Sequence, residues 1–354
     1  MRLNKEIDIA FALLRCSLEG RDTASSLDVS MSAQNWWSLF RLLQRNNVAA
    51  LVSEVFDKMP KEMLPPRAVL IPWLAERDKA TEWARYQKDV QDDIVDTLQK
   101  HGIQTLVLKG THIATYYPHP ELREFGDLDL YFFDKHDEAD RVAKKELGVS
   151  ISDKSHHHTK YDYRGVTVES HYDFVNTHYP PSNRNYETLL KEQAPSPTFE
   201  VLFLLRHMAC HFAASRITLR DLEDWALTCQ ALEDKVDWTL VNKTIEDYGM
   251  TEFVAVLNAI ATQRLSVSMS QCLAVLQSYS LNVSLVHKVE HDLVYGSEEA
   301  DNKADGLERL GWKLRRWRAL AWKRRMVFND SPLRLLLTSL TSHIEKPQSI
   351  LHKQ

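Results

Sequence analysis

Glycine, proline and cysteine are all scarce in this chain of 354 residues, which contains 10 glycines, 12 prolines and 4 cysteines. Few glycines and prolines argue against an all-β fold with its many turns, and favour a mostly helical chain. The cysteines are widely scattered and form no CxxC pair. We therefore expect a reduced, cytoplasmic setting.

Long apolar runs and an excess of basic residues are also missing. No apolar run approaches the roughly 20 residues that span a bilayer. The first eight residues carry acids where a signal peptide is apolar. We therefore expect a soluble protein with no membrane span. The formal net charge of -5 argues against bulk attraction to nucleic acid, although it leaves room for a local basic patch.

Three segments follow from the apolar periodicity. The pattern predicts helices in residues 1–95 and a small α/β unit in residues 96–180. Its strands are expected at 103–108 and 128–133, and a hairpin at Arg164-Gly165. Prolines between 180 and 197 indicate a linker. Residues 196–354 are again helical, with one helix expected at 270–279. The sequence thus predicts a predominantly helical α+β fold.

Two carboxylates, Asp127 and Asp129, alternate with apolar residues at the start of the second predicted strand, Asp127 directly before it and Asp129 within it. Residues i and i+2 of a strand point to the same face, roughly 6–7 Å apart. That spacing lets both aspartates converge on a pair of divalent metal ions. Magnesium at such a site usually holds the phosphates of a nucleotide. The pattern therefore indicates metal-dependent nucleotidyl transfer.

A third carboxylate for this site is expected from the hairpin. In the run 166–171, the valines share one strand face while Thr167, Glu169 and His171 share the other. Glu169 is therefore a metal ligand if its strand lies beside that of Asp127, and it could also help to deprotonate an acceptor. His171 could orient a carboxylate, touch the substrate or have a structural role.

A phosphate-binding turn is predicted at Lys109-Gly110-Thr111, where the first strand turns into a helix. Glycine permits close approach of a phosphate, threonine adds a hydroxyl, and lysine adds positive charge. Arg123 is a second candidate for contact with phosphate or substrate. The alternative for Arg123 is an ion pair with a neighbouring glutamate, Glu121 or Glu124.

These motifs in combination resemble the uncharacterised nucleotidyltransferase family of the polymerase-β-like superfamily. The resemblance covers roughly residues 35–260, and includes the helical stretch 219–226. It implies a small mixed β-sheet flanked by helices, an NTP donor and two Mg²⁺ ions. By position, Asp127 and Asp129 match the paired metal ligands, and Glu169 matches the third. The usual Gly-Ser of the phosphate turn is here Gly110-Thr111.

The expected activity is a magnesium-dependent transfer of an NMP group, AMP from ATP, to an acceptor hydroxyl. A small molecule or a protein is favoured as acceptor, since the acidic charge disfavours long nucleic acid. Two alternatives remain. One is a nucleotide-binding or interaction protein without turnover, as in a toxin–antitoxin or biosynthetic pair. The other is an RNA-directed transferase.

Three further motifs allow two interpretations each. His156-His157-His158 could bind metal, but adjacent histidines on a strand alternate faces. Arg206 and His211 have the R-x4-H spacing of small helical ribonucleases, but this pattern is short and common by chance. The tryptophan-containing basic stretch 312–325 could contact RNA or a membrane surface, or pack its tryptophans on the protein body.

Overall fold

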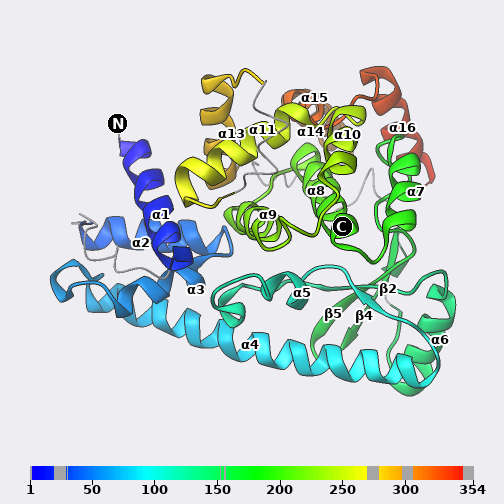
Figure 1. Ribbon diagram of the computed structural model, residues 1–354, viewed down its shortest axis with the longest axis horizontal. Helices are drawn as coiled ribbons and strands as arrows, with labels where there is room; N and C mark the ends of the chain where they lie inside the picture. The colour runs from blue at the N-terminus through cyan, green and yellow to red at the C-terminus, as the bar shows by residue number, and fades with distance from the viewer. Residues whose placement is uncertain are drawn as a thin grey trace. The chain divides into compact units, whose positions relative to one another are not determined.

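The structure, a computed structural model, describes residues 2–19, 29, 31–151, 153–154, 157–268, 279–296 and 306–345 (Figure 1). The chain divides into two compact units. Unit 1 comprises residues 1–172, 218–231 and 260–268, and unit 2 comprises residues 173–217, 232–259 and 269–354. Both the N-terminal helices and the α/β core lie in unit 1, and the division into three segments stays a prediction.

The first helices of unit 1 pack around a cluster of aromatic side chains. These helices are α1 (Arg2–Glu19), α2 (Ala33–Gln44), α3 (Ala49–Val52), η2 (Ser53–Asp57) and η3 (Lys61–Met63). Trp36, Phe56 and Trp73 meet edge to face, with ring centroids 4.9–6.4 Å apart. The indole N–H of Trp73 donates to the carbonyl of Ala49 at 2.7 Å, so this large side chain is buried with its polar atom satisfied.

The long helix α4 (Arg67–Lys100) supports the sheet of unit 1 (Figure 1). It ends where the sequence predicts, before Gly102, whose φ of 71° suits glycine. The sheet follows, with the remaining short elements of the unit. These are β1 (Leu106–Val107), α5 (Thr111–Ala114), η4 (Pro120–Leu122), β2 (Leu128–Tyr131), α6 (His136–Glu146), β3 (Asp153–Lys154), β4 (His158–Tyr163), β5 (Val166–His171), α9 (Leu219–Ala231) and η5 (Ala261–Leu265).

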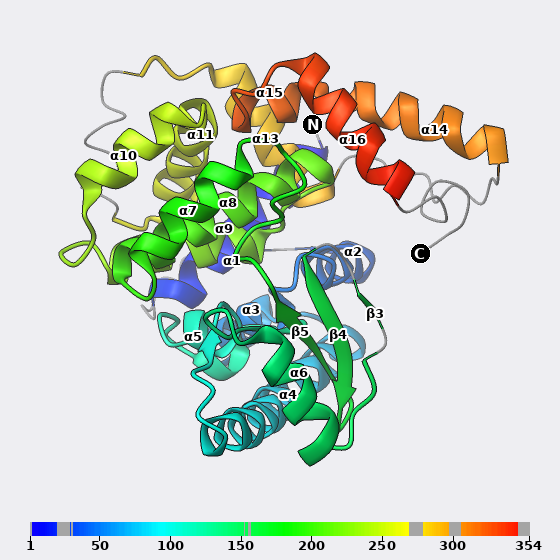
Figure 2. The same ribbon diagram turned by 90° about the vertical axis from the view of Figure 1, so that its right-hand side faces the viewer.

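The sheet is mixed, as expected, with the strand order β1-β2-β5-β4-β3. Strands β2 and β5 run parallel, and the other neighbours run antiparallel. Strands β4 and β5 form the predicted hairpin around Arg164-Gly165 (Figure 2). The strands predicted at 103–108 and 128–133 are shorter than expected, because the residues that flank them make no ladder pairs.

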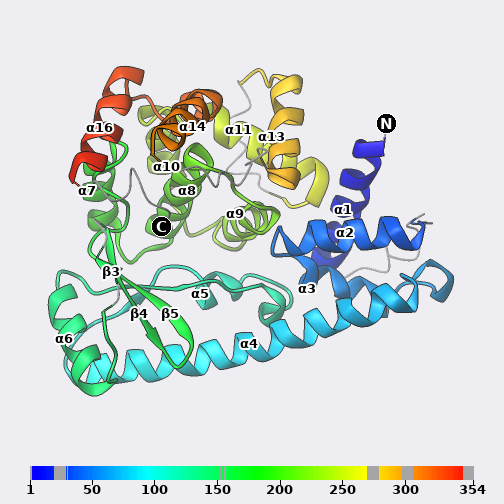
Figure 3. The ribbon, with the colours of Figure 1, turned by 180° about the vertical axis from the view of Figure 1, so that it is seen from behind.

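One face of the sheet makes the hydrophobic core of unit 1. Leu128, Leu130 and Val168 belong to this core and pack with buried residues of α4 and α6. Figure 3 shows these two helices beside the strands. Strand residues alternate between faces, so Asp129 and Glu169 point to the opposite face. Helices α4 and α6 thus cover one face of the sheet, and the polar side chains of Asp129 and Glu169 lie on the other face.

Unit 2 is helical throughout its described part. Its helices are α7 (Asn183–Gln193), α8 (Pro197–Ala214), α10 (Trp238–Asp247), α11 (Thr251–Ile260), α13 (Val283–Tyr295), α14 (Gly306–Ala319), α15 (Ala321–Val327) and α16 (Pro332–Glu345). Helix α7 occupies the stretch between prolines that the sequence assigns to a linker. The helix expected at 270–279 falls almost wholly outside the described residues. Every described helix is too short or too polar to cross a membrane.

Candidate active site

Two of the three predicted acids lie side by side on neighbouring strands. Asp129 of β2 and Glu169 of β5 are register partners in the parallel pair. Both side chains lie on the face opposite the core, and Asp129 is only 8% exposed. Carboxylate oxygens of Asp129 and Glu169 and a ring nitrogen of His171 lie within 4.8 Å of one another. Because carboxylates are ligands that magnesium prefers, this trio could hold a metal ion.

Asp127 joins this group through a lysine of strand β4. Lys160 Nζ lies 2.5 Å from Glu169 Oε1 and 3.5 Å from Asp127 Oδ2. The Asp127 side chain is 46% exposed and is not part of the trio within 4.8 Å. Burial, and then the charge of Glu169, raise the pKa of Asp127. Carboxylates that share a site raise one another's pKa in this way.

A second lysine lies on the other side of the site. Lys109 Nζ is 3.1 Å from Asp129 Oδ2. Lys109 and Lys160 together place positive charge beside all three acids, so each carboxylate has a cationic partner. The sequence pattern predicts a phosphate contact for Lys109 and no role for Lys160. Alternation on β4 places Lys160 opposite Glu169, which is the signal that could have found it.

His171 fixes the orientation of both inner acids. Its Nε2 lies 3.0 Å from Asp129 Oδ1 and 3.5 Å from Glu169 Oε2. Burial alone would lower the pKa of His171, but the hydrogen bonds to Asp129 and Glu169 outweigh it and raise the pKa. Burial alone would raise the pKa of Glu169, whereas hydrogen bonds from His171 and Lys160 outweigh it and lower the pKa. Of the roles considered for His171, orienting carboxylates fits this geometry.

The predicted phosphate turn follows strand β1, which pairs with the strand that carries Asp129. Gly110 has φ 61° and ψ -118°, a conformation that residues with a Cβ rarely adopt. The hydroxyl of Thr111 donates to Gln91 Oε1 at 2.5 Å. Gln87 of the same helix donates to the carbonyl of Gly126 at 2.8 Å. Helix α4 therefore anchors both the turn and the residue just before Asp127.

Arg123 is part of a buried ion pair. It is 4% exposed, and its guanidinium donates to both carboxylate oxygens of Asp224 in α9. The partner of Arg123 is therefore Asp224, and not Glu121 or Glu124, the two neighbours that the sequence suggested. A guanidinium held in this way positions the segment before β2, and we leave Arg123 out of the proposed phosphate contacts.

A pocket of about 360 Å³ lies next to the phosphate turn. Residues that line it include Ala84 of α4, Thr111 and Ala114 of α5, Pro120 and Phe125. Its size matches sites for small molecules, which are mostly apolar and hold about 300–1,000 Å³. Thr111 lines the pocket and also belongs to the turn. Phe125, another lining residue, lies two positions before Asp127 in the sequence.

The ribonuclease-like spacing joins a core residue of α8 to an exposed one, since Arg206 lies in the core of unit 2 whereas His211 is exposed. Arg206 is fully buried, and its guanidinium donates to Asn183 Oδ1, Ser182 Oγ and the carbonyl of Val327. A fully buried guanidinium cannot reach an RNA phosphate. These contacts give Arg206 a role in packing within unit 2.

Part of the basic stretch 312–325 is also internal. Lys323 is fully buried and lies 2.5 Å from Asp292 Oδ2, and Arg324 stacks on Trp317 at 4.2 Å from the ring centroid. Arg316 lies over Trp312 and donates to the carbonyl of Ala214. These contacts support the interpretation in which the tryptophans pack and the cations are paired.

The family to which these motifs point is found by comparison with known proteins. Residues 32–266 match the model of a family described as "Uncharacterised nucleotidyltransferase". No curated protein and no solved structure matches the chain. The matched region contains the whole sheet, the phosphate turn and the three acids.

Proposed function

The chain belongs to the uncharacterised nucleotidyltransferase family, and we propose that it transfers AMP from ATP to a hydroxyl of a small molecule or a protein side chain. The observation that carries this proposal is the register of Asp129 and Glu169. A buried and a partly buried acid on adjacent parallel strands, on the sheet face away from the core, are costly unless they serve a cation.

Asp127, Asp129 and Glu169 would hold two magnesium ions. The donor set fits, since it consists of carboxylate oxygens that already attract Lys109 and Lys160 in place of a metal. When bound, magnesium would neutralise charge on the transferred phosphate and on the leaving pyrophosphate. His171 keeps the carboxylates of Asp129 and Glu169 in place through its Nε2.

The turn at Gly110-Thr111 would receive the triphosphate. Gly110 presents no side chain there, and Lys109 stands between the turn and Asp129, where its ammonium could contact a phosphate oxygen. In the reaction, the acceptor oxygen forms a bond to the α-phosphorus while the bond to pyrophosphate breaks. The acceptor's proton passes to a carboxylate of the site, for which Glu169 is our candidate.

The pocket beside Thr111 favours a small acceptor group over a long polymer. Its volume accommodates a small molecule or one inserted side chain. The net charge of -5 points the same way, since a polymer of phosphates would be repelled.

Incubation with α-labelled nucleotides, Mg²⁺ and cell extract tests the proposal. Label should appear on an acceptor with ATP, and much less with the other three nucleotides. Asp127→Ala and Asp129→Ala should abolish transfer, whereas Asp137→Ala, which alters a fully exposed acid on α6, should not. Nucleotide binding without transfer to any acceptor would instead support the non-catalytic alternative.

A further inference from the structure

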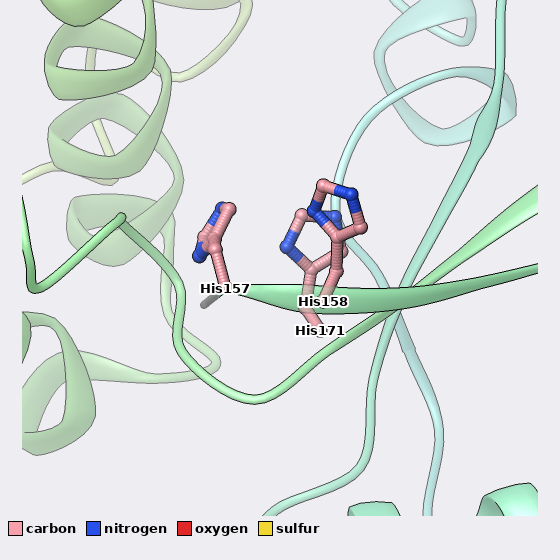
Figure 4. Close-up of side chains that lie close together, drawn as sticks. All are labelled: His157, His158 and His171. Atoms are coloured by element: carbon pink, nitrogen blue, oxygen red, sulfur yellow. The ribbon is translucent and has the colours of Figure 1, made fainter. Parts of the chain in front are cut away.

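Three histidines gather beside the carboxylates. His157, His158 and His171 have ring centroids 4.7–5.5 Å apart, and one ring nitrogen from each lies within 4.8 Å of the others (Figure 4). Adjacent histidines on a regular strand would point to opposite faces. Here His158 is the first residue of β4 and His157 lies in a bend before it, so both rings reach His171. His156 lies outside the described residues.

The backbone fixes these positions. His158 and His171 are direct partners in the antiparallel β4–β5 ladder, which places their side chains on the same face. The amide of Tyr172 donates to the carbonyl of His157 at 3.0 Å, which extends the pairing past the end of the strand. The cluster is therefore built on a paired hairpin.

The hydrogen bonds of His171 leave one of its nitrogens available to a ligand. If Nε2–H donates to Asp129 Oδ1, Nδ1 carries a lone pair. That Nδ1 is buried and has no hydrogen-bond partner among the residues that the structure describes, while the whole side chain is 5% exposed. Orphaned buried nitrogens are costly. A carboxylate behind a histidine whose other nitrogen faces a metal is a frequent arrangement in zinc sites.

We propose that His157, His158 and His171 bind a zinc ion, separately from the magnesium ions expected at the carboxylates. Imidazole nitrogen suits zinc, whereas carboxylate oxygen suits magnesium, so the two groups select different cations. His158 Nδ1 lies 3.7 Å from Glu169 Oε2, so the histidine cluster borders the carboxylates. Three protein ligands leave the fourth position to water or a substrate atom.

Zinc binding would draw the three rings closer together. Zinc–nitrogen bonds of about 2.0–2.1 Å in a tetrahedral site place the nitrogens roughly 3.3 Å apart, whereas here they lie within 4.8 Å of one another. Bound zinc would tie the start of β4 to the end of β5. This inference does not depend on nucleotidyl transfer, because zinc binding is measured without any substrate.

Zinc titration of the full chain tests the site. Metal-free protein is titrated with Zn²⁺ against a chromophoric chelator, with excess Mg²⁺ present to occupy the carboxylates. Co²⁺ in place of Zn²⁺ reports four-coordinate nitrogen ligation through its visible absorption. We expect one zinc per chain, and a loss of affinity of at least about 100-fold in His157→Ala and in His158→Ala, since each removes a ligand.

Two variants separate this site from others. His101→Ala removes a more exposed histidine outside the cluster and should bind zinc as the wild type does. Asp127→Ala removes a proposed magnesium ligand and should also keep its zinc. Circular dichroism shows that each variant is folded. Absence of zinc binding would overturn the proposal, as would zinc that is lost in Asp127→Ala but kept in His157→Ala, since zinc would then occupy the carboxylate site.

Discussion

Arg123 and Asp224 form a buried, bidentate ion pair across 101 residues of sequence. Arg123 Nε lies 2.7 Å from Asp224 Oδ1, and Nη2 lies 2.7 Å from Oδ2. The hydroxyl of Tyr117 donates to the same Oδ1 at 2.7 Å. These contacts connect α9 to the segments on either side of η4, and so hold the approach to the strand that carries the aspartates.

Replacing Arg123 with methionine should destabilise the protein strongly. The change leaves Asp224 buried without its cation, a loss of about 3–5 kcal/mol. Urea unfolding of unit 1, followed by tryptophan fluorescence, measures it. Arg77→Met is the matched control, because its pair with the exposed Asp57 is worth about 0–1 kcal/mol. If the Arg123→Met protein is instead as stable as the wild type and has a raised KM for ATP, Arg123 contacts phosphate.

Local sequence patterns were enough to predict that Asp129 and Glu169 lie on the polar face of the sheet. Alternation in the hairpin put Glu169 on the polar face, and an apolar run on each side of Asp129 marked a strand. The adjacency of β2 and β5 then follows from the fold, and it confirms the condition on which Glu169 depended. The roles of these acids as metal ligands stay predictions.

Local sequence patterns did not predict the contacts between segments that are far apart in the chain. Arg123 has acids at 121 and 124, which periodicity offers as partners, yet its partner is Asp224. The bend that brings His157 to His171 breaks the alternation from which opposite faces were inferred. In each case tertiary packing, which no local pattern contains, decided the outcome.

Substituting alanine for Gly110 should weaken nucleotide binding. A residue with a Cβ is strained by about 1–3 kcal/mol at this φ and ψ, so the turn must move. Under the proposed function, the KM for ATP should rise about tenfold. Gly148→Ala imposes a similar strain, at φ 68°, outside the site. It should lower stability while leaving KM unchanged, and equal KM values in the two variants would contradict the phosphate role of the turn.

Removing Lys160 should increase the effect of magnesium on stability. Lys160→Met takes a cation from Glu169 and Asp127, so the metal-free protein should unfold at a lower temperature. Mg²⁺ should then raise the unfolding midpoint more than in the wild type, because it no longer competes with the ammonium group. Thermal unfolding with EDTA and with increasing Mg²⁺ measures this. Lys88→Met, which removes an exposed pair with Asp92, should respond as the wild type does, and a Lys160→Met protein insensitive to Mg²⁺ would count against metal binding.

The pH dependence of unit 2 should depend on Glu187. This carboxylate is 5% exposed and accepts hydrogen bonds from the amides of Phe174 and Val175. Burial raises its pKa to about 7. Between pH 4.5 and 7 the folded chain therefore keeps a proton that the unfolded chain has released, so the free energy of unfolding falls as pH rises through this window.

Glu187→Gln removes this titration and should flatten the pH profile. The difference between variant and wild type should change by up to about 3 kcal/mol from pH 4.5 to pH 8, since each pKa unit corresponds to about 1.4 kcal/mol. Urea unfolding at a series of pH values measures it. Glu192→Gln changes an exposed acid of the same helix and should keep the wild-type slope. Parallel profiles for wild type and Glu187→Gln would show that Glu187 titrates as an ordinary carboxylate, and that its two backbone hydrogen bonds offset the cost of burying the charge.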